Sequence, residues 1–161
     1  VLANQAANYL ASGVSPRRMG NGHANVVPYQ AFATADGQLV IAVGNDGQFR
    51  KLCGVLGESE WADDARFATN AARLANRTAL IPLLAAKIAG WEAQPLSLAL
   101  EAEDVPAGPI NDLAGVFADP QVIARGMRFR PDGAFVDGVA NPIVIDGERM
   151  VASDGAPVLA G

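Results

Sequence analysis

The sequence predicts an α+β fold in which a short antiparallel sheet is combined with several helices. Two apolar runs flank Asp36-Gly37, where glycine permits the positive φ of a tight turn, so residues 27–44 are predicted to form a β-hairpin. Residues 45–104 show apolar side chains at helical spacing, separated by capping residues. From residue 127 the pattern returns to short strands, which completes the mixed class.

Composition and charge narrow the possible functions. The chain has 161 residues, of which 50% are hydrophobic and 18% are charged, as expected for one folded domain with a core. The formal charge is −5 and no basic stripe extends beyond Arg17-Arg18, which argues against nucleic acid as a partner. No apolar run is long enough to cross a membrane and no signal peptide opens the chain, so a cytoplasmic location is expected. The single cysteine, Cys53, is interpreted as a buried structural thiol rather than a nucleophile.

Two helices and a helical turn are predicted in the first part of the chain. Residues 1–11 form a helix that ends at Ser12-Gly13. Asn45-Asp46 caps the helix that follows the hairpin, and Gly57 ends it as a glycine after the C-cap. Residues 58–63 then form a short helical turn.

A helical pair is predicted next. Thr69 or Asn70 caps its first member, and Asn76 caps its second member, which Gly90 ends. Pro82 lies inside the second helix, where it removes a backbone hydrogen bond. We therefore expect a kink or a later start of this helix.

Another short helix, around Leu96–Leu100, ends before Val105-Pro106. Residues 107–110 are too rich in glycine and proline for a central strand. They are interpreted as an extended approach to a helix that is capped by Asn111 or Asp112.

The last part of the chain combines one short helix with short strands. Asp119 caps the helix, with Pro120 at its first position, and Arg125-Gly126 closes it. Within residues 127–151, three segments read as strands and two as turns. The predicted strands are 127–130, 134–136 and 142–145, and the predicted turns are 131–133 and 137–138.

Residues 20–25, Gly-Asn-Gly-His-Ala-Asn, are the most distinctive segment and are called the glycine loop below. They precede the hairpin and contain the only histidine of the chain, His23. Glycine lets the backbone approach a ligand closely, although an ordinary exposed connection also has this composition. No metal-ligand cluster, nucleophile elbow or phosphate-binding loop is present, and the acidic residues at 101–104 are interpreted as a solvated cluster. The residues alone thus indicate a soluble α+β domain with one unusual loop.

Several motifs in order resemble one family. Gly20–Tyr29 looks like a Gly-Asn-x-His-x-Asn-x-x-Pro-Tyr segment. Asp63–Phe67 looks like Asp-Asp-Pro-Arg-Phe, with alanine in place of the proline. Val105–Asn111 and Asp119–Met127 are the most specific pieces. Together these motifs cover nearly the whole chain and resemble the class III CoA-transferases, the family of formyl-CoA transferase and of carnitine and bile-acid CoA-transferases.

The resemblance implies that the chain is the C-terminal half of such an enzyme. Residues 1–26 would be a linker helix and active-site loop leading from an N-terminal large domain. Residues 27–126 would be the small α+β domain, and 127–161 a C-terminal return segment with short strands. The start at Val1 without a methionine and the end at Gly161, within a segment resembling Pro-x-Leu-Gly-Glu-His-Thr, agree with a fragment.

The resemblance also implies a reaction. The family moves coenzyme A between an acyl-CoA thioester and a free carboxylic acid through an aspartyl intermediate. No aspartate of this chain matches the motif of that nucleophile, so no catalytic residue is assigned and the isolated chain is expected to be inactive. The CoA thioester is a substrate, and neither a cofactor nor a metal is expected. The full-length protein is expected to be a homodimer.

The same resemblance assigns substrate-binding residues to the glycine loop, which in the family covers the active site and shields reactive intermediates from water. These residues are Asn21, Gly22, His23, Ala24 and Asn25. For His23, both donation to a substrate carboxylate and a purely structural hydrogen-bonding role remain open.

Two other functions are compatible with the sequence. α-Methylacyl-CoA racemases share the fold and move a proton at the carbon next to the thioester. Alternatively, the chain is a non-catalytic half-protein that supports a separate catalytic subunit. CoA transfer is the preferred hypothesis because the glycine loop looks more like the transferase branch.

Overall fold

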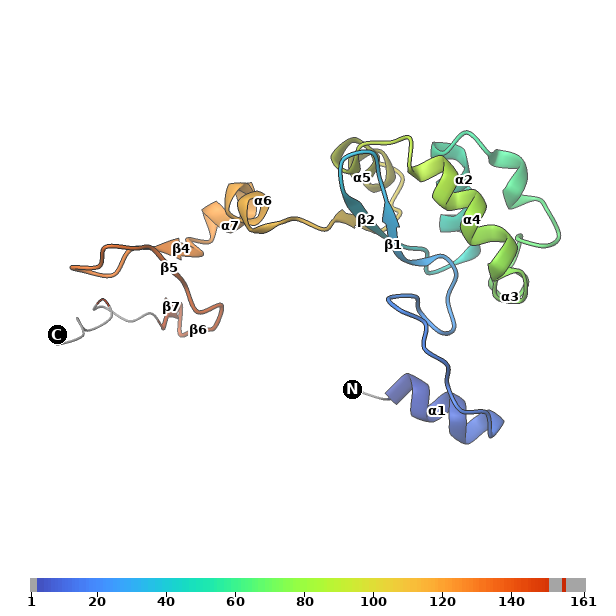
Figure 1. Cartoon of the computed structure of the whole chain (residues 1–161), viewed down its shortest axis with the longest axis horizontal. Helices are drawn as coiled ribbons and strands as arrows, with labels where there is room; N and C mark the ends of the chain where they lie inside the picture. The colour runs from blue at the N-terminus through green and yellow to red at the C-terminus, as the bar shows by residue number, and fades with distance from the viewer. Residues whose placement is uncertain (1–2, 151–154, 156–161) are drawn as a thin grey trace. The chain divides into compact units, whose positions relative to one another are not determined.

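The computed structural model describes residues 3–150 and 155, and it divides the chain into two compact units, Val1–Ile110 and Asn111–Gly161 (Figure 1). The boundary at residue 110 lies earlier than residue 126, where the small domain was predicted to end. The assignment of these segments to the domains of a larger enzyme stays a prediction. The first unit begins with helix α1 and contains a sheet with the helices that cover it. Its elements are α1 (Ala3–Ser12), β1 (Tyr29–Ala33), β2 (Gln38–Ala42), α2 (Asp46–Val55), the 3₁₀ helix η1 (Ser59–Ala62), α3 (Asn70–Ala75), α4 (Arg77–Ile88), α5 (Ala93–Glu101) and β3 (Ala107–Pro109).

The sheet of the first unit is antiparallel, with the strand order β1-β2-β3. The predicted hairpin is confirmed, and its register runs from Tyr29↔Ala42 to Ala33↔Gln38. Residues 107–109 are not just an extended approach, because they pair with β2 from Ile41↔Ala107 to Leu39↔Pro109. Since β3 is an edge strand, Pro109 can occupy it without breaking a central ladder.

Asp36 fastens the hairpin turn to the start of α5. Its carboxylate accepts hydrogen bonds from the backbone N–H of Ala93 at 2.8 Å and from the hydroxyl of Thr34 at 3.0 Å. The Ala93 bond is the main cause that lowers the pKa of Asp36, and the Thr34 bond adds to it. The turn residue that the sequence identified therefore also positions a helix 57 residues later in the chain.

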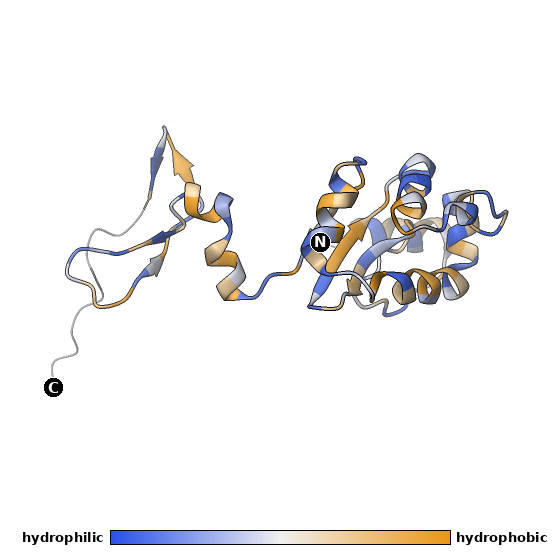
Figure 2. Ribbon diagram, turned by 90° about the horizontal axis from the view of Figure 1, so that it is seen from above, coloured by the Kyte–Doolittle hydropathy of each residue, from blue (hydrophilic) through white to orange (hydrophobic). Residues whose placement is uncertain are grey.

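The core lies between the sheet and the helices. Helix α4 contacts β1, α5 contacts β2 and β3, and α2 contacts α5 and η1. Figure 2 shows hydrophobic residues on both the strands and the helices of this unit. The largest buried apolar side chains come from β2, α2, α4 and α5 and from the segment before α3: Phe49, Phe67, Leu39, Ile41, Leu52, Leu80, Leu84, Ile88, Leu96 and Leu100.

Cys53 belongs to this core, as predicted, and burial raises the pKa of its thiol to about 11. Only about one thiol in a thousand is then ionised at about pH 8, and the thiolate is the reactive form. We expect a disulfide reagent such as DTNB to leave Cys53 unmodified in the native protein and to react within seconds in denaturant. Stoichiometric labelling of the native protein at a similar rate would contradict the buried placement.

Side-chain caps begin two helices of the first unit, α2 and α3, and one predicted cap is wrong. Thr69, not Asn70, caps α3 by accepting from the N–H of Ala72 at 3.2 Å. Asn76 stands at the start of α4 but its side chain does not cap that helix. Its amide instead donates to the carbonyls of Arg66 and Ala72, and so closes the end of α3.

Asn45 caps α2 as predicted, since its Oδ1 accepts from the N–H of Gln48 at 2.9 Å. Gln48 returns a bond, with its Oε1 accepting from the N–H of Gly44 at 2.7 Å. We expect Asn45→Ala to lower the free energy of unfolding by about 1 kcal/mol, measured by urea denaturation. Asn45→Ser keeps a capping oxygen and should lose less, so equal losses for the two variants would contradict this role.

Pro82 neither ends α4 nor delays its start, because the helix begins at Arg77. The side chains of Leu80, Leu84 and Ile88 are spaced by four residues and are fully buried. Pro82 itself is exposed, so water can reach the backbone carbonyl that it leaves without a donor. Burial of the apolar stripe thus outweighs the hydrogen bond that proline removes.

The second unit contains α6 (Leu113–Ala118), α7 (Pro120–Ala124), and two separate two-stranded sheets. Asp112, one of the two predicted caps, accepts from Gly115, and Asp119 accepts from Gln121 and Val122. The strands pair as β4 (Arg128–Phe129) with β5 (Gly138–Val139), and as β6 (Val144–Ile145) with β7 (Glu148–Arg149).

One strand prediction and one turn prediction in this unit are wrong. Residues 134–136 are not a strand, and Gly138, predicted in a turn, pairs with Phe129. The physical reason is local charge, since Asp137 forms ion pairs with both Arg128 and Arg130 and so brings 137–139 alongside β4. The Asp146-Gly147 turn between β6 and β7 was not predicted, although both residues have positive φ, as a two-residue hairpin turn requires.

Among the described residues of the second unit, Ala140 is the one buried hydrophobic side chain. Large apolar side chains such as Phe135, Leu113 and Val136 are exposed. The first two residues of the predicted first helix, the end of the predicted 127–151 region, and the family-like segment at the C-terminus lie outside the described residues.

Candidate functional site

The glycine loop connects α1 to β1 and turns sharply at its start. Gly20 has a φ of +59°, a region that favours glycine, and the N–H of Gly22 donates to the carbonyl of Met19 at 3.0 Å. A Cβ atom on Gly22 would lie 3.2 Å from Nη1 of Arg77 and 3.3 Å from the carbonyl oxygen of Met19. Gly22 is therefore packed closely on one side, and a larger residue would push the loop away from α4.

His23 is held at three points. Its N–H donates to the carbonyl of Tyr29 at 2.9 Å, and its ring stacks on the Tyr29 ring with centroids 5.2 Å apart. Its Nδ1 accepts from the N–H of Asn25 at 3.1 Å. Because Nδ1 is an acceptor, this pattern places the proton of the neutral imidazole on Nε2. The Nε2–H of His23 therefore makes no hydrogen bond within the loop and can donate to a ligand.

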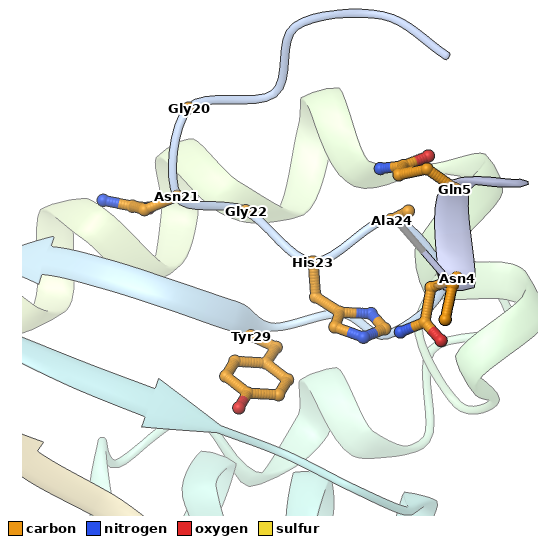
Figure 3. Close-up of a pocket in the computed structure, with 9 residues that line it drawn as sticks. Asn4, Gln5, Gly20, Asn21, Gly22, His23, Ala24 and Tyr29 are labelled. Atoms are coloured by element: carbon orange, nitrogen blue, oxygen red, sulfur yellow. The ribbon is translucent and has the colours of Figure 1, made fainter. Parts of the chain in front are cut away.

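An open cavity of about 560 Å³ lies between the glycine loop and α1. Figure 3 shows the rings of His23 and Tyr29 at this cavity, together with the amide side chain of Asn4. The described lining residues are Ala3, Asn4, Gln5, Gly20, Asn21, Gly22, His23, Ala24 and Tyr29. The lining has amide, imidazole and phenol groups but no carboxylate, so it can bind a polar or anionic ligand through hydrogen bonds.

The structure brings four of the five predicted site residues, Asn21 to Ala24, to this cavity and places Asn25 elsewhere. The Asn25 side chain forms two reciprocal amide hydrogen bonds with Asn8 of α1, at 2.9 and 3.0 Å. Its carbonyl accepts from Nδ2 of Asn70 at 2.8 Å. Asn25 thus joins the loop to α1 and to α3.

Arg77 of α4 supports the glycine loop and is not among the described lining residues of the cavity at His23. Its Nη2 donates to the carbonyl of His23 at 2.5 Å, and partial burial lowers the pKa of the guanidinium. The same side chain makes the close approach to Gly22. A single arginine at the start of α4 therefore fixes the backbone of the two central residues of the glycine loop.

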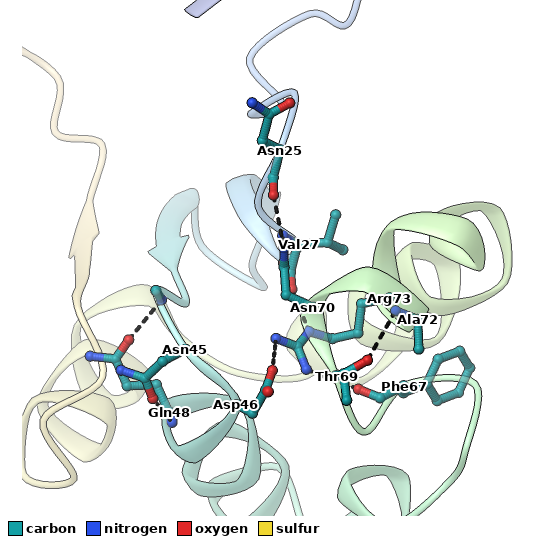
Figure 4. A network of polar contacts seen from close by, with 11 residues as sticks. Asn25, Val27, Asn45, Asp46, Gln48, Phe67, Thr69, Asn70, Ala72 and Arg73 are labelled. Carbon is teal, nitrogen blue, oxygen red and sulfur yellow. Dashed lines mark hydrogen bonds and ion pairs between the residues drawn. The ribbon is translucent and has the colours of Figure 1, made fainter. Parts of the chain in front are cut away.

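Arg73 of α3 holds the chain where the loop enters the sheet (Figure 4). Its guanidinium is fully buried and donates to the carbonyls of Val27 at 2.6 Å and Phe67 at 2.9 Å. It also forms an ion pair with Asp46 at 2.8 Å and lies over the Phe49 ring. The buried positive charge is thereby paired with Asp46 and two carbonyl groups. Through these contacts, the Arg73 side chain connects the end of the loop, α2 and the segment before α3.

Sequence reasoning missed Asn70, Arg73 and Arg77 as determinants of the site. Asn70 works with Arg73, since its Oδ1 accepts from the N–H of Val27 at 3.1 Å. The three polar residues are spaced by three and four positions, which places residues on one side of a helical segment. That spacing is the signal that the sequence offered.

Over the part of the chain that the structure describes, no helix has the length and apolar character needed to span a membrane. The same residues contain no group of three or more His, Cys, Asp or Glu side chains arranged to hold a metal ion.

Comparison with known proteins identifies the fold of the site. The structure matches the crystal structure of a CAIB/BAIF family protein from Brucella suis with a TM-score of 0.85 and 52% sequence identity, over 99% of this chain and 42% of that one. In sequence, the chain is 49% identical to the succinate–glutarate CoA-transferase of Agrobacterium fabrum over 148 residues, 90% of this chain and 37% of the relative. It is 40% identical to the succinyl-CoA:glutarate CoA-transferase of Mus musculus, over 88% of this chain and 32% of the relative.

The chain therefore spans 32% to 42% of the length of these relatives. The family model for CoA-transferase family III matches residues 1–161, the whole of the sequence. Both the family-like motifs and the α+β architecture agree with this match, and the suspected family is confirmed. The chain belongs to CoA-transferase family III.

Proposed function

We propose that this chain is part of an enzyme that transfers coenzyme A between an acyl-CoA thioester and a free carboxylate. The observation that carries the proposal is the glycine loop, whose residues Asn21–Ala24 line a cavity in a chain that belongs to CoA-transferase family III. The relatives named for CoA transfer support the same reaction type.

We propose short dicarboxylates as the substrate class. The relatives include enzymes named for succinate and glutarate, and the acetyl-CoA:oxalate CoA-transferase of Acetobacter aceti, which is 36% identical. Every acid in these names except acetate carries two carboxylates. Succinyl-CoA as donor and glutarate as acceptor are the first pair to test.

In the proposed reaction, an aspartate outside residues 1–161 attacks the thioester carbonyl. The CoA thiolate leaves, and the aspartate and the acyl group form a mixed anhydride. The thiolate then attacks the aspartyl carbonyl, releases the first acid and leaves CoA as an enzyme thioester. The acceptor carboxylate attacks that thioester in turn, and the same two steps run in reverse. Both covalent intermediates hydrolyse in water, so a cover over the site protects them.

The glycine loop is the proposed cover. The Nε2–H of His23 is placed to donate to a substrate carboxylate, because its Nδ1 is occupied by the Asn25 N–H. Asn21, Gly22 and Ala24 form the wall, and Asn25 ties the loop to α1 through Asn8. The loop thus holds the proposed donor, the Nε2–H of His23, on a backbone fixed by hydrogen bonds.

The test uses the full protein that contains this chain, incubated with succinyl-CoA and glutarate, with glutaryl-CoA measured by mass spectrometry. Formation of glutaryl-CoA supports the proposal. Exchange of deuterium from D₂O into the carbon next to the thioester of a 2-methylacyl-CoA, without transfer, would identify racemase chemistry instead. If neither transfer nor exchange is observed, the result favours the alternative that the chain is a non-catalytic half-protein.

We propose further that the full protein is a homodimer, as the family resemblance implies. Sedimentation of the full protein tests this, and a monomer at all concentrations would contradict it.

A further inference from the structure

A second cavity, of about 820 Å³, lies between α1, the segment 12–19 and the start of α4. Three arginines line it: Arg17, Arg18 and Arg77. Its described lining contains no aspartate or glutamate. This is called the arginine cavity below.

The charge of the arginine cavity differs from that of the rest of the chain. The chain carries a formal charge of −5, and seven of its twelve lysines and arginines form ion pairs with carboxylates among the described residues. Arg17, Arg18 and Arg77 have no such carboxylate in the described part of the chain, although all three face one concave site. Like charges gathered in a concave site repel one another, and a bound anion offsets that repulsion.

The other lining residues suit an anion attached to a carbon chain. Gln5, Asn8 and Gln30 provide amide groups, while Ile81 and Pro82 provide apolar surface. Guanidinium groups bind carboxylate and phosphate oxygens in pairs, which an ammonium group cannot do. Gln5 also lines the cavity at His23, so the two cavities meet at this side chain.

We propose that the arginine cavity binds an oxyanion of the substrates, either a carboxylate of the dicarboxylic acid or a phosphate of coenzyme A. The identity of these ligands rests on the proposed function, whereas the presence of an anion site does not. Arg17 and Arg18 are the residues to vary, because both are exposed and neither makes a hydrogen bond that holds the fold among the described residues. Arg77 is less suitable since it also holds the His23 carbonyl.

The experiment measures binding to the full protein by calorimetry, without turnover, for the wild type and for the double variant Arg17→Gln/Arg18→Gln. Glutarate is compared with pentanoate, which lacks the second carboxylate, and coenzyme A with 3′-dephospho-CoA. Arg125→Gln is compared with the single variant Arg18→Gln as the matched control, because each removes one arginine charge and Arg125 is exposed and outside the cavity.

We expect the double variant to bind one of the two full ligands on the order of tenfold more weakly, as when a charge-assisted hydrogen bond is lost. A loss for glutarate but not pentanoate assigns the site to the second carboxylate. A loss for coenzyme A but not 3′-dephospho-CoA assigns it to the 3′-phosphate, and an equal loss for both forms of CoA assigns it to the pyrophosphate. Arg18→Lys should show a smaller loss than Arg18→Gln.

Unchanged binding of both ligands in the double variant would overturn the proposal, as would an equal loss in Arg125→Gln. Because binding is measured without turnover, these outcomes do not depend on CoA transfer. A wild type that binds glutarate through Arg17 and Arg18 but transfers no CoA would contradict the proposed function and leave the anion site established.

Discussion

Replacing Arg73 with methionine is expected to lower the free energy of unfolding by about 3–5 kcal/mol, the largest stability loss that we predict for a polar residue. Methionine fills much of the same volume but donates no hydrogen bond. The carbonyls of Val27 and Phe67 would lose a charged donor inside the core, where water does not replace it. Asp46 matters less, since its side chain is 53% exposed and water can solvate it.

Urea denaturation followed by tryptophan fluorescence measures this loss. Arg66→Met is the matched control, because Arg66 is a surface residue whose ion pair with Asp64 is largely solvated. Arg73→Lys should fall between the two, since one ammonium cannot reach both carbonyls and Asp46 with the geometry of a guanidinium. A loss below about 1 kcal/mol for Arg73→Met would show that Arg73 is not needed to hold the entry to β1.

The second large effect concerns activity. We expect Arg77→Met to lower kcat/KM of the full enzyme by about 100-fold, because a small displacement of a positioned segment is enough to lose that much. The variant removes the donor to the His23 carbonyl and the side chain that packs against Gly22. The fold should tolerate the change, with a loss of about 1 kcal/mol in the free energy of unfolding, since Arg77 is only partly buried.

Steady-state kinetics with succinyl-CoA and glutarate, paired with urea denaturation, separates these effects. The matched control is Lys87→Met, which removes an exposed cation from the other end of the same helix, away from both cavities. If Arg77→Met kept full activity, the loop would be positioned by other contacts. If Lys87→Met lost as much activity as Arg77→Met, the effect would come from α4 in general.

Local features of the fold were predictable from the sequence because their causes lie within a few residues. The hairpin turn lies where Asp36-Gly37 predicts it, but Gly37 does not have the positive φ expected of it, and hydrogen bonds between Thr34 and Gly37 close the turn instead. The Asn45 cap and the Gly57 stop each depend on the hydrogen bonds or conformational preference of one short segment. Asp119 with Pro120 begins α7 for the same reason. These elements were placed correctly.

The contacts that hold the candidate site were not predictable, because their partners are far apart in sequence. Arg73 binds a carbonyl 46 residues away, and Arg77 binds one 54 residues away. No local pattern tells which carbonyl a guanidinium will reach. Of the two outcomes expected of Pro82, the later helix start is not observed, since the cost of the proline is local but the buried stripe that outweighs it depends on packing against the sheet.

The glycine loop was found from its composition and its family-like motif, but the roles of its members separate only in the structure. His23 and Asn25 both looked like ligand-binding residues. The structure leaves the Nε2–H of His23 at the cavity and uses both polar groups of the Asn25 side chain to bind Asn8. The pairing of Asn8 with Asn25 cannot be predicted from the sequence of α1 or of the loop alone, because neither segment specifies the other as its partner.

The most direct test of the central claim, that the glycine loop covers a CoA-transfer site, compares transfer with hydrolysis in the full enzyme. With succinyl-CoA and glutarate, glutaryl-CoA reports transfer and free CoA reports hydrolysis. We expect the wild type to form mainly glutaryl-CoA, and Gly22→Val, whose side chain would meet Arg77 and Met19, to raise the share of free CoA severalfold. A Gly22→Val enzyme with the wild-type ratio and rate would contradict the claim, as would a wild type that forms no glutaryl-CoA.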